Sequence, residues 1–134
     1  MHLVERVRAS IQLVSIRLQL PHLLASEPLD GLLGRLGTRR GTVTLPLAHL
    51  DHALDRGEAW TNRVPLVPRT CLYRTIARYA LYRRHGFPAE FVMAISPRGP
   101  DEDGHAWLEF NGQPYREERA AEFVESFRYP PRVL

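Results

Sequence analysis

The sequence lacks lysine altogether and contains a single cysteine. All 18 basic side chains among its 134 residues are arginines, set against 15 carboxylates. One cysteine excludes an internal disulfide and any zinc site built from paired cysteines. No apolar run reaches the roughly 18 residues that a membrane span requires, and no N-terminal apolar stretch ends in a signal-peptidase site. We therefore expect a cytoplasmic protein whose thiol stays reduced and which has no membrane partner.

The arginines do not form a nucleic-acid-binding pattern. Only Arg39-Arg40 and Arg83-Arg84 are adjacent, and carboxylates are interleaved with the rest. We attribute the arginine-only basic set to codon usage and expect no nucleic-acid partner. With 44% hydrophobic and 25% charged residues and a net charge of +3, the composition is that of a globular protein and excludes disordered and low-complexity classes. The length fits one domain with a real core, residues 1–134.

The first part of the chain, residues 1–57, is expected to be helical. Residues 3–20 predict an amphipathic helix that Pro21 ends. Its apolar positions recur at helical spacing: Leu3, Val7, Ile11, Val14 and Leu18. Shorter helices are expected within 29–36 and over 46–56, and residues 58–69, which include Trp60, are expected to form an ordered loop.

The clearest helix in the sequence begins after Thr70, a good N-cap residue. Arg83 and Arg84 fall in its last turn, Gly86 can adopt the left-handed C-terminal conformation, and Pro88 prevents continuation. Three strands are then expected over 89–96, 105–110 and 113–117, with a tight hairpin turn at Asn111-Gly112. Residues 119–127 are expected to form a closing helix. This order, helices followed by a small antiparallel sheet, predicts an α+β fold.

Cys71 falls in the first turn of that helix, where free N–H groups and the helix dipole stabilise a thiolate. A buried cysteine acting as a small hydrophobic side chain is the alternative. His105 opens a later strand, so a thiol and a base that could activate it are both present. A two-residue turn places Glu118 opposite His105, and a one-residue bulge places Glu117 there instead. An acid at either position could orient the imidazole, although each residue taken singly also fits a purely structural role.

Two segments carry a resemblance to a known family. Residues 69–74 (RTCLYR) through 82–89 (YRRHGFPA) resemble the cysteine block of the lasso-peptide leader peptidases, the B proteins of lasso-peptide biosynthesis. Residues 104–109 (GHAWLE) with the Asn111-Gly112 turn resemble their histidine block. The resemblance covers roughly residues 60–118 and is looser over the helical N-terminal part.

The resemblance implies a transglutaminase-like, papain-like core in residues 58–134, with the cysteine helix packed on a small antiparallel sheet. It implies that Cys71 is the nucleophile and His105 the general base of a cysteine peptidase that removes the leader from a ribosomally made precursor. The family's aspartate aligns with Glu117, a departure from the family pattern, and Glu118 is the other candidate. It further implies a split form without a fused leader-recognition domain, whose partners are the precursor's leader, a separate small recognition protein and an ATP-dependent cyclase.

Other readings remain open at the level of sequence. A transglutaminase-like acyl transferase could let an amine intercept the thioester, and an inactive module could keep the fold and only bind the precursor. His49 and His52 lie three apart on a predicted helix but have no third ligand at matching spacing, so no metal and no cofactor are expected. Trp60 and Trp107 are interpreted as core residues rather than walls of a cleft.

Overall fold

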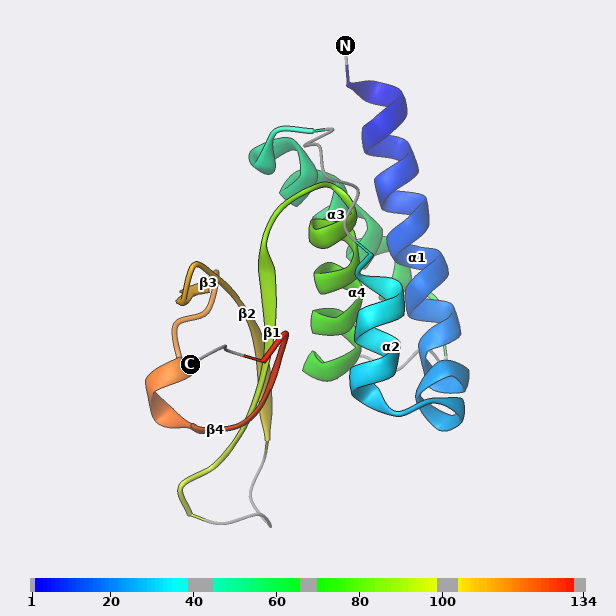
Figure 1. Ribbon diagram of the computed structural model, residues 1–134. Helices are drawn as coiled ribbons and strands as arrows, with labels where there is room; N and C mark the ends of the chain where they lie inside the picture. Colours follow the sequence, from blue (N-terminus) through cyan, green and yellow to red (C-terminus); the bar gives the residue numbers. More distant parts are fainter. Residues whose placement is uncertain (1, 39–44, 66–69, 99–103, 132–134) are drawn as a thin grey trace.

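A computed structural model describes residues 2–38, 45–65, 70–98 and 104–131. Within these residues four helices come first and a four-stranded sheet follows, which confirms the α+β class (Figure 1). The helices are α1 (Leu3–Ser26), α2 (Leu29–Leu36), α3 (Leu47–Thr61) and α4 (Cys71–Arg84). The strands are β1 (Ala89–Ile95), β2 (His105–Phe110), β3 (Gln113–Tyr115) and β4 (Val124–Tyr129), with a 3-10 turn at Ala120–Glu122.

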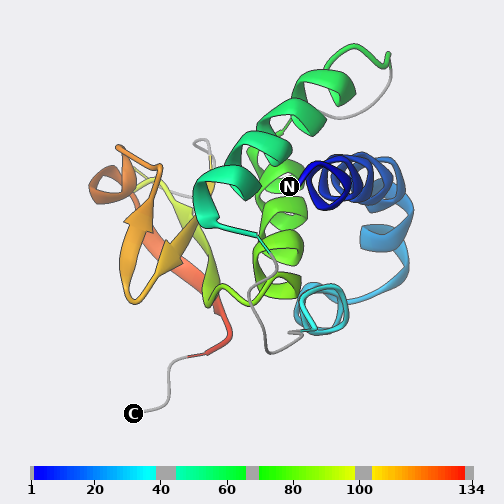
Figure 2. The same ribbon diagram turned by 90° about the horizontal axis from the view of Figure 1, so that it is seen from above.

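Helix α4 is the centre of the molecule. The sheet lies on one side of it and α1 with α2 on the other, as Figures 1 and 2 show from two directions. Because both sides are covered, α4 contributes several fully buried side chains, among them Ile76, Tyr79 and Tyr82. Phe91 of β1 packs edge-on against Tyr79 and joins the sheet to this core. The element that begins with Cys71 is therefore held in place by two layers.

The predicted caps of α4 are confirmed. The Thr70 side chain accepts a hydrogen bond from the Tyr73 N–H at 3.4 Å, and Gly86 has φ of 91°, which only glycine adopts at little cost. Arg83 and Arg84 occupy the last turn, where cations favour the helix dipole.

The sheet is antiparallel throughout, in the order β3-β2-β1-β4. Asn111 and Gly112 form the predicted hairpin turn with φ of 55° and 80°, so that Phe110 pairs with Gln113. The β2–β3 pairing extends only to Leu108 and Tyr115. The first residue of β2 instead lies opposite Ala94 of β1.

The prediction of a closing helix over 119–127 is wrong. Only Ala120–Glu122 forms a short 3-10 turn, and Val124–Tyr129 is strand β4, paired with β1 across a bulge at Met93 and Ala94. Phe127 reaches the core and packs against Phe91. Pairing with the open edge of β1 outweighed the local helical pattern.

Two expectations for the N-terminal half are also corrected. Helix α1 continues through Pro21 to Ser26, because Leu23 and Leu24 beyond the proline pack against the core. The stripe expected to face the core is exposed: Leu3 is 71% and Ile11 62% accessible, and the core face carries Ala9, Leu13, Ile16 and Leu20 instead.

The loop expected over 58–69 is helical at its start. Helix α3 runs to Thr61 and carries Trp60, which is 62% exposed and so is not a core residue. Residues 66–69 lie outside the described part.

Among the described residues, no helix has the length and apolar character needed to cross a membrane.

Candidate active site

Cys71 is the first residue of α4 and is a free, half-buried thiol. In the first turn of a helix the N–H groups have no acceptor within the helix. The Thr70 side chain accepts the N–H of Tyr73, and within the described residues the N–H groups of Cys71 and Leu72 have no acceptor and are available to an anion. The helix dipole adds a positive potential at the same place.

A hydrogen bond fastens the first turns of α4 to the start of β2. The Thr75 hydroxyl donates to the carbonyl oxygen of Ala106 at 3.3 Å in a buried position. Thr75 follows Cys71 by one helical turn, and Ala106 follows His105 directly. The bond therefore brings the helix turn that carries the thiol beside the strand end that carries the imidazole.

His105 is paired with Glu117. The Nε2 atom of His105 lies 2.9 Å from each carboxylate oxygen of Glu117, and the side chains are only 15% and 13% exposed. Because a carboxylate accepts hydrogen bonds, the pairing places the imidazole proton on Nε2. The Nδ1 atom is then the nitrogen with a free lone pair, able to take a proton from a thiol.

Aromatic rings fix the plane of the imidazole. Phe123 stacks on His105 with 5.0 Å between centroids and 29° between planes, and the Trp107 ring centroid lies 5.7 Å from that of His105.

The Trp107 indole N–H donates to the buried Glu109 at 3.0 Å, and Glu109 in turn pairs with Arg128 of β4 at 2.8 Å. Trp107 is 6% exposed and packs in a small cluster with Val92 and Ala94, as a core residue does. It also contacts the histidine and lines a polar cleft beside it, so the expectation that it forms no cleft wall is wrong.

Glu117 is held by the backbone around it. Its Oε1 atom accepts the Arg119 N–H at 2.9 Å in addition to its contact with His105. The preceding residue, Arg116, has φ of 53°, a left-handed conformation that is uncommon for a residue with a Cβ atom. This conformation ends the β2–β3 ladder after Tyr115 and turns the chain so that the next side chain reaches His105. Glu117, and not Glu118, therefore contacts the imidazole.

The Arg116 side chain anchors this turn to α3. Its guanidinium lies 3.3 Å from Asp55, which also pairs with Arg78 of α4. Burial raises the pKa of Asp55, but the hydrogen bonds and charges of the two arginines outweigh it and lower the pKa below its ordinary value. Arg78 also contacts Glu58 at 2.6 Å, and although its burial opposes charge, these carboxylates raise its pKa above the ordinary value.

Asp51 joins the same region through two tyrosines. Its carboxylate accepts hydrogen bonds from the hydroxyls of Tyr82 in α4 and Tyr115 in β3. Burial and the bond to Asp51 raise the pKa of Tyr115 to about 12. The hairpin arm that leads to Glu117 is thus fixed to two helices.

A polar cleft of about 210 Å³ opens beside the histidine–glutamate pair. It lies between α3, α4 and the β2–β3 hairpin, and Glu117, Trp107 and Thr75 all line it. Arg74, one turn beyond the thiol on the exposed side of α4, lines it as well.

The structure brings together some of the residues singled out in the sequence. His105 and Glu117 are in direct contact, whereas Cys71 makes no hydrogen bond to His105 in the described part of the chain. In free enzymes, catalytic groups are often too far apart for a good hydrogen bond and come closer when substrate binds. Among the described residues, no three histidine, cysteine or acidic side chains lie together as they would to hold a metal ion.

Sequence reasoning missed the acidic face of α3 and the ring of Phe123. The signal for the first was present: Asp51, Asp55 and Glu58 recur at i, i+4 and i+7, which places them on one side of a helix. Phe123 was assigned to a helix that does not form, so its stacking on the histidine had no signal in the sequence.

Comparison with known proteins identifies the family of this chain. The model of the transglutaminase-like superfamily matches residues 5–128, which is most of the chain and includes Cys71, His105 and Glu117. Neither a curated protein nor a solved structure shows a significant match. Members of this superfamily commonly use a catalytic cysteine, which agrees with a thiol at the start of the central helix. The chain belongs to the transglutaminase-like superfamily.

Proposed function

We propose that this protein is a cysteine peptidase that removes the leader peptide from a lasso-peptide precursor. The observation that carries the proposal is the His105–Glu117 pair, held beside the capped helix that begins with Cys71. The resemblance of the cysteine and histidine segments to the lasso-peptide leader peptidases supplies the substrate class. In this proposal Cys71 is the nucleophile, His105 the general base and acid, and Glu117 the positioning residue.

The reaction is acyl transfer to water. The Nδ1 atom of His105 takes the Cys71 proton, and the thiolate attacks the carbonyl carbon at the leader–core junction. The Cys71 N–H, at the helix start, donates to the developing oxyanion. When the C–N bond breaks, His105 protonates the leaving amine, which becomes the new N-terminus of the core. Water then attacks the thioester, the C–S bond breaks, and the leader leaves as a carboxylic acid.

Glu117 contributes by orienting the imidazole. By accepting a hydrogen bond from the Nε2–H it keeps Nδ1 as the basic nitrogen, and its negative charge stabilises the imidazolium that forms. The rings of Phe123 and Trp107 hold the plane in which Nδ1 acts. No metal or cofactor takes part in the proposed reaction.

The proposed partners follow from the same resemblance. A separate small protein binds the leader and delivers it, and an ATP-dependent cyclase uses the freed amine to close the macrolactam ring. The reaction takes place in the cytoplasm, where the precursor is made and the thiol stays reduced.

The test is product analysis with the purified chain, the precursor and the recognition protein, followed by mass spectrometry. We expect free leader acid and free core peptide, and no cleavage by Cys71→Ala. An added primary amine distinguishes cross-linking, since a leader–amide product without leader acid would identify an amine acyl transferase. Cleavage by Cys71→Ala would contradict the proposal, and binding of the precursor without any product would indicate a binding module.

A further inference from the structure

We propose that the groove between α1 and α3 is a docking site for an amphipathic helix of another protein, with acidic residues flanking its apolar face. This proposal is independent of the proposed peptidase activity. It begins from the unexpected exposure of the apolar stripe of α1. Leu3, Val7 and Ile11 remain 71%, 48% and 62% accessible, although they recur at the spacing of a packed helix face.

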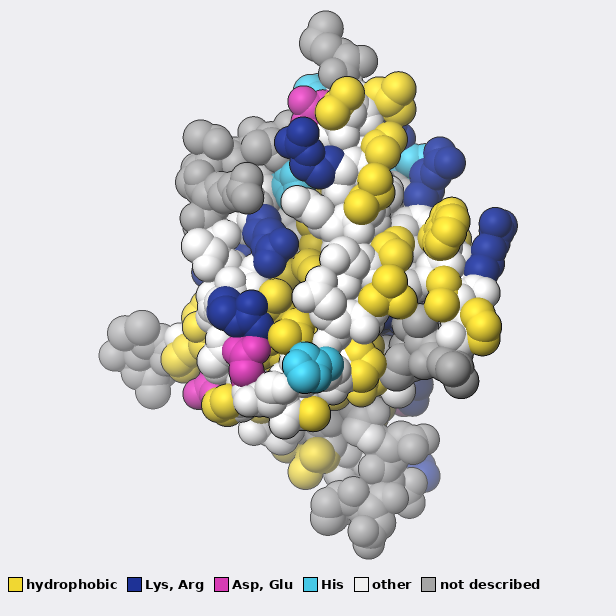
Figure 3. Space-filling view, turned by 90° about the vertical axis from the view of Figure 1, so that its right-hand side faces the viewer, with side chains coloured by type: hydrophobic (Ala, Val, Ile, Leu, Met, Phe, Trp, Pro, Cys, Tyr) yellow, Lys and Arg dark blue, Asp and Glu magenta, His cyan; other side chains and the backbone are white. Residues whose placement is uncertain are grey.

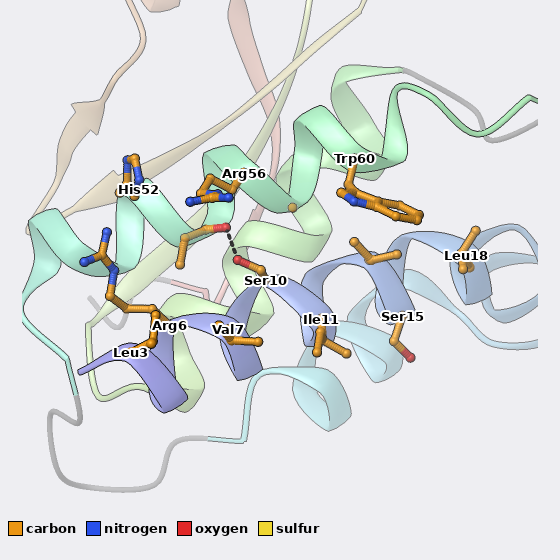
Figure 4. Close-up of a pocket in the computed structure, with 13 residues that line it drawn as sticks. Leu3, Arg6, Val7, Ser10, Ile11, Ser15, Leu18, His52, Arg56 and Trp60 are labelled. Atoms are coloured by element: carbon orange, nitrogen blue, oxygen red, sulfur yellow. Dashed lines mark hydrogen bonds between the residues drawn. The ribbon is translucent and has the colours of Figure 1, made fainter. Parts of the chain in front are cut away.

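These side chains line a groove of about 750 Å³. One wall is α1, with Val7, Ile11 and Leu18, and the other is α3, with Trp60 (Figure 4). In the space-filling view, hydrophobic side chains form a stripe down this face of the molecule with arginines beside it (Figure 3). A surface of this kind on a folded domain marks an interaction site.

Small residues close the floor of the groove. The Ser10 hydroxyl donates to the carbonyl oxygen of Ala53 at 2.7 Å, as Figure 4 shows. A Cβ atom at Gly57 would lie 2.8 Å from Leu13 Cδ2 and 2.9 Å from the backbone carbonyl oxygen of Ser10. The helices therefore touch along the floor, while the larger side chains above it face solvent. The groove is therefore a result of the close packing of α1 and α3.

The charges at the groove favour an acidic partner. The thirteen described residues that line it include Arg6, Arg56 and His52, and none of them is a carboxylate. Figure 4 shows Arg6 and His52 toward one end and Trp60 with Leu18 toward the other. A complementary helix carries an apolar face along its whole length and acidic side chains beside that face at one end.

The dimensions and chemistry favour a helix over an extended peptide. The wall from Leu3 to Leu18 is about 22 Å long at about 1.5 Å per residue, or about four helical turns. An extended segment would need partners for its N–H and C=O groups, and the groove offers few, since the Ser10 hydroxyl is already bonded to Ala53. A helix satisfies its own backbone and presents only side chains.

Other occupants fit less well. A second copy docked groove to groove would gather Arg6 and Arg56 of both copies in one interface, and no lining carboxylate would neutralise them. A flat lipid surface would touch the rims and leave the concave floor uncovered. A protein helix fills the groove and supplies the missing negative charge.

The test uses the full chain and two synthetic helical peptides of about eighteen residues, long enough for the groove. Both carry leucines at i, i+3, i+4 and i+7. One has glutamates beside the leucines in its first two turns, and the other has lysines there. Binding is measured by fluorescence anisotropy at low salt, and circular dichroism verifies that each protein variant is folded.

We expect the glutamate peptide to bind at least ten-fold more tightly than the lysine peptide. The variant Ile11→Ser should reduce its affinity at least ten-fold. Val4→Ser is the matched control, since Val4 is 66% exposed on the same helix but does not line the groove, and it should leave the affinity unchanged. The double variant Arg6→Glu/Arg56→Glu should reverse the preference between the peptides.

Four results would overturn the proposal. These are equal affinity for both peptides, binding of neither, a concentration-dependent dimer in sedimentation that Ile11→Ser dissociates, and co-sedimentation with phosphatidylglycerol vesicles that Ile11→Ser abolishes. The third would identify a second copy as the occupant, and the fourth a lipid surface.

Discussion

At the scale of single residues, Glu117 is the carboxylate with the most closely defined contacts to the histidine. Both of its oxygens lie 2.9 Å from His105 Nε2, and one of them also accepts the Arg119 N–H. The left-handed conformation of Arg116 directs the longer side chain back toward β2. The position therefore has a carboxylate with defined partners rather than a solvated surface glutamate.

The variant Glu117→Gln should separate the charge of this carboxylate from its size. An amide cannot stabilise the imidazolium. It can also donate its N–H to Nε2, which favours the tautomer with the proton on Nδ1, the nitrogen that must act as the base. We expect kcat for leader removal to fall by about two to four orders of magnitude, with little change in KM. Glu118→Gln is the matched control and should retain activity, because Glu118 is exposed and the imidazole is paired with its neighbour. Equal losses in the two variants would contradict the assignment.

At the scale of elements, helix contacts decide which glycines are replaceable. Gly57 lies where α3 touches α1, and an added Cβ would meet both a side chain and a backbone oxygen below 3.0 Å. In α2, an added Cβ at Gly31 would meet only the Pro28 ring, at 3.9 Å. Both glycines lie within helices, so the intrinsic gain in helix stability on replacement by alanine is similar.

The pair Gly57→Ala and Gly31→Ala should therefore shift stability in opposite directions. Gly31→Ala should raise the free energy of unfolding by about 0.5–1 kcal/mol, the usual gain in a helix. Gly57→Ala should lower it by about 1–3 kcal/mol, because the helices must separate. Urea titrations followed by circular dichroism measure both. A stabilising Gly57→Ala would show that α1 and α3 do not touch as described.

Sequence patterns predicted those elements whose signals are local. Thr70 and Gly86 specify the two ends of α4, and Asn111-Gly112 specifies the hairpin, because caps and tight turns depend on the conformation of one or two residues. The strand at 124–129 could not be predicted in the same way, since it exists only through pairing with β1.

The N-terminal helix shows a second reason for failure. Helix α1 has apolar side chains on two faces, and periodicity identified the exposed stripe as the buried one. Pattern alone gives the period of a helix and not the side on which its neighbours pack. For the candidate site, spacing along the hairpin allowed either Glu117 or Glu118 to be the partner of His105. The backbone turn at Arg116, which the spacing does not predict, selects Glu117.

At the scale of the whole molecule, Asp51 links three elements at one point. It lies on α3 and accepts the hydroxyls of Tyr82 in α4 and Tyr115 in β3. Replacement by alanine would leave both hydroxyls without this acceptor and would release the hairpin arm that leads to Glu117.

We expect Asp51→Ala to lower the free energy of unfolding by about 2 kcal/mol, roughly 1 kcal/mol for each lost hydrogen bond. It should also reduce the rate of leader removal through displacement of Glu117. Glu118→Ala is an exposed control that should stay within about 0.5 kcal/mol of the wild type. Wild-type stability in Asp51→Ala would show that this three-way junction does not hold the fold together.

The buried tyrosines predict a loss of stability at high pH. Burial raises the pKa of Tyr79 to about 12, and burial with the bond to Asp51 does the same for Tyr115. In the unfolded chain tyrosine titrates near 10, so the folded state holds more protons between the two values. The stabilisation is complete below pH 10 and is lost as pH rises toward 12.

For the fully buried Tyr79 the loss should be about 1.4 kcal/mol by pH 11. Urea titrations at pH 8 and pH 11 measure it, and Tyr79→Phe should lose less stability over the same interval than the wild type. An equal loss in Tyr79→Phe and wild type would assign the alkaline sensitivity to other groups.

In the proposed mechanism Cys71, His105 and Glu117 act as one unit. Because Cys71 is the only cysteine, its rate of alkylation by iodoacetamide at neutral pH can be read directly from the intact mass. We predict that the wild-type thiol reacts at least ten-fold faster than the thiol of His105→Ala, with Glu117→Gln in between. Equal rates in the three folded proteins would contradict the account.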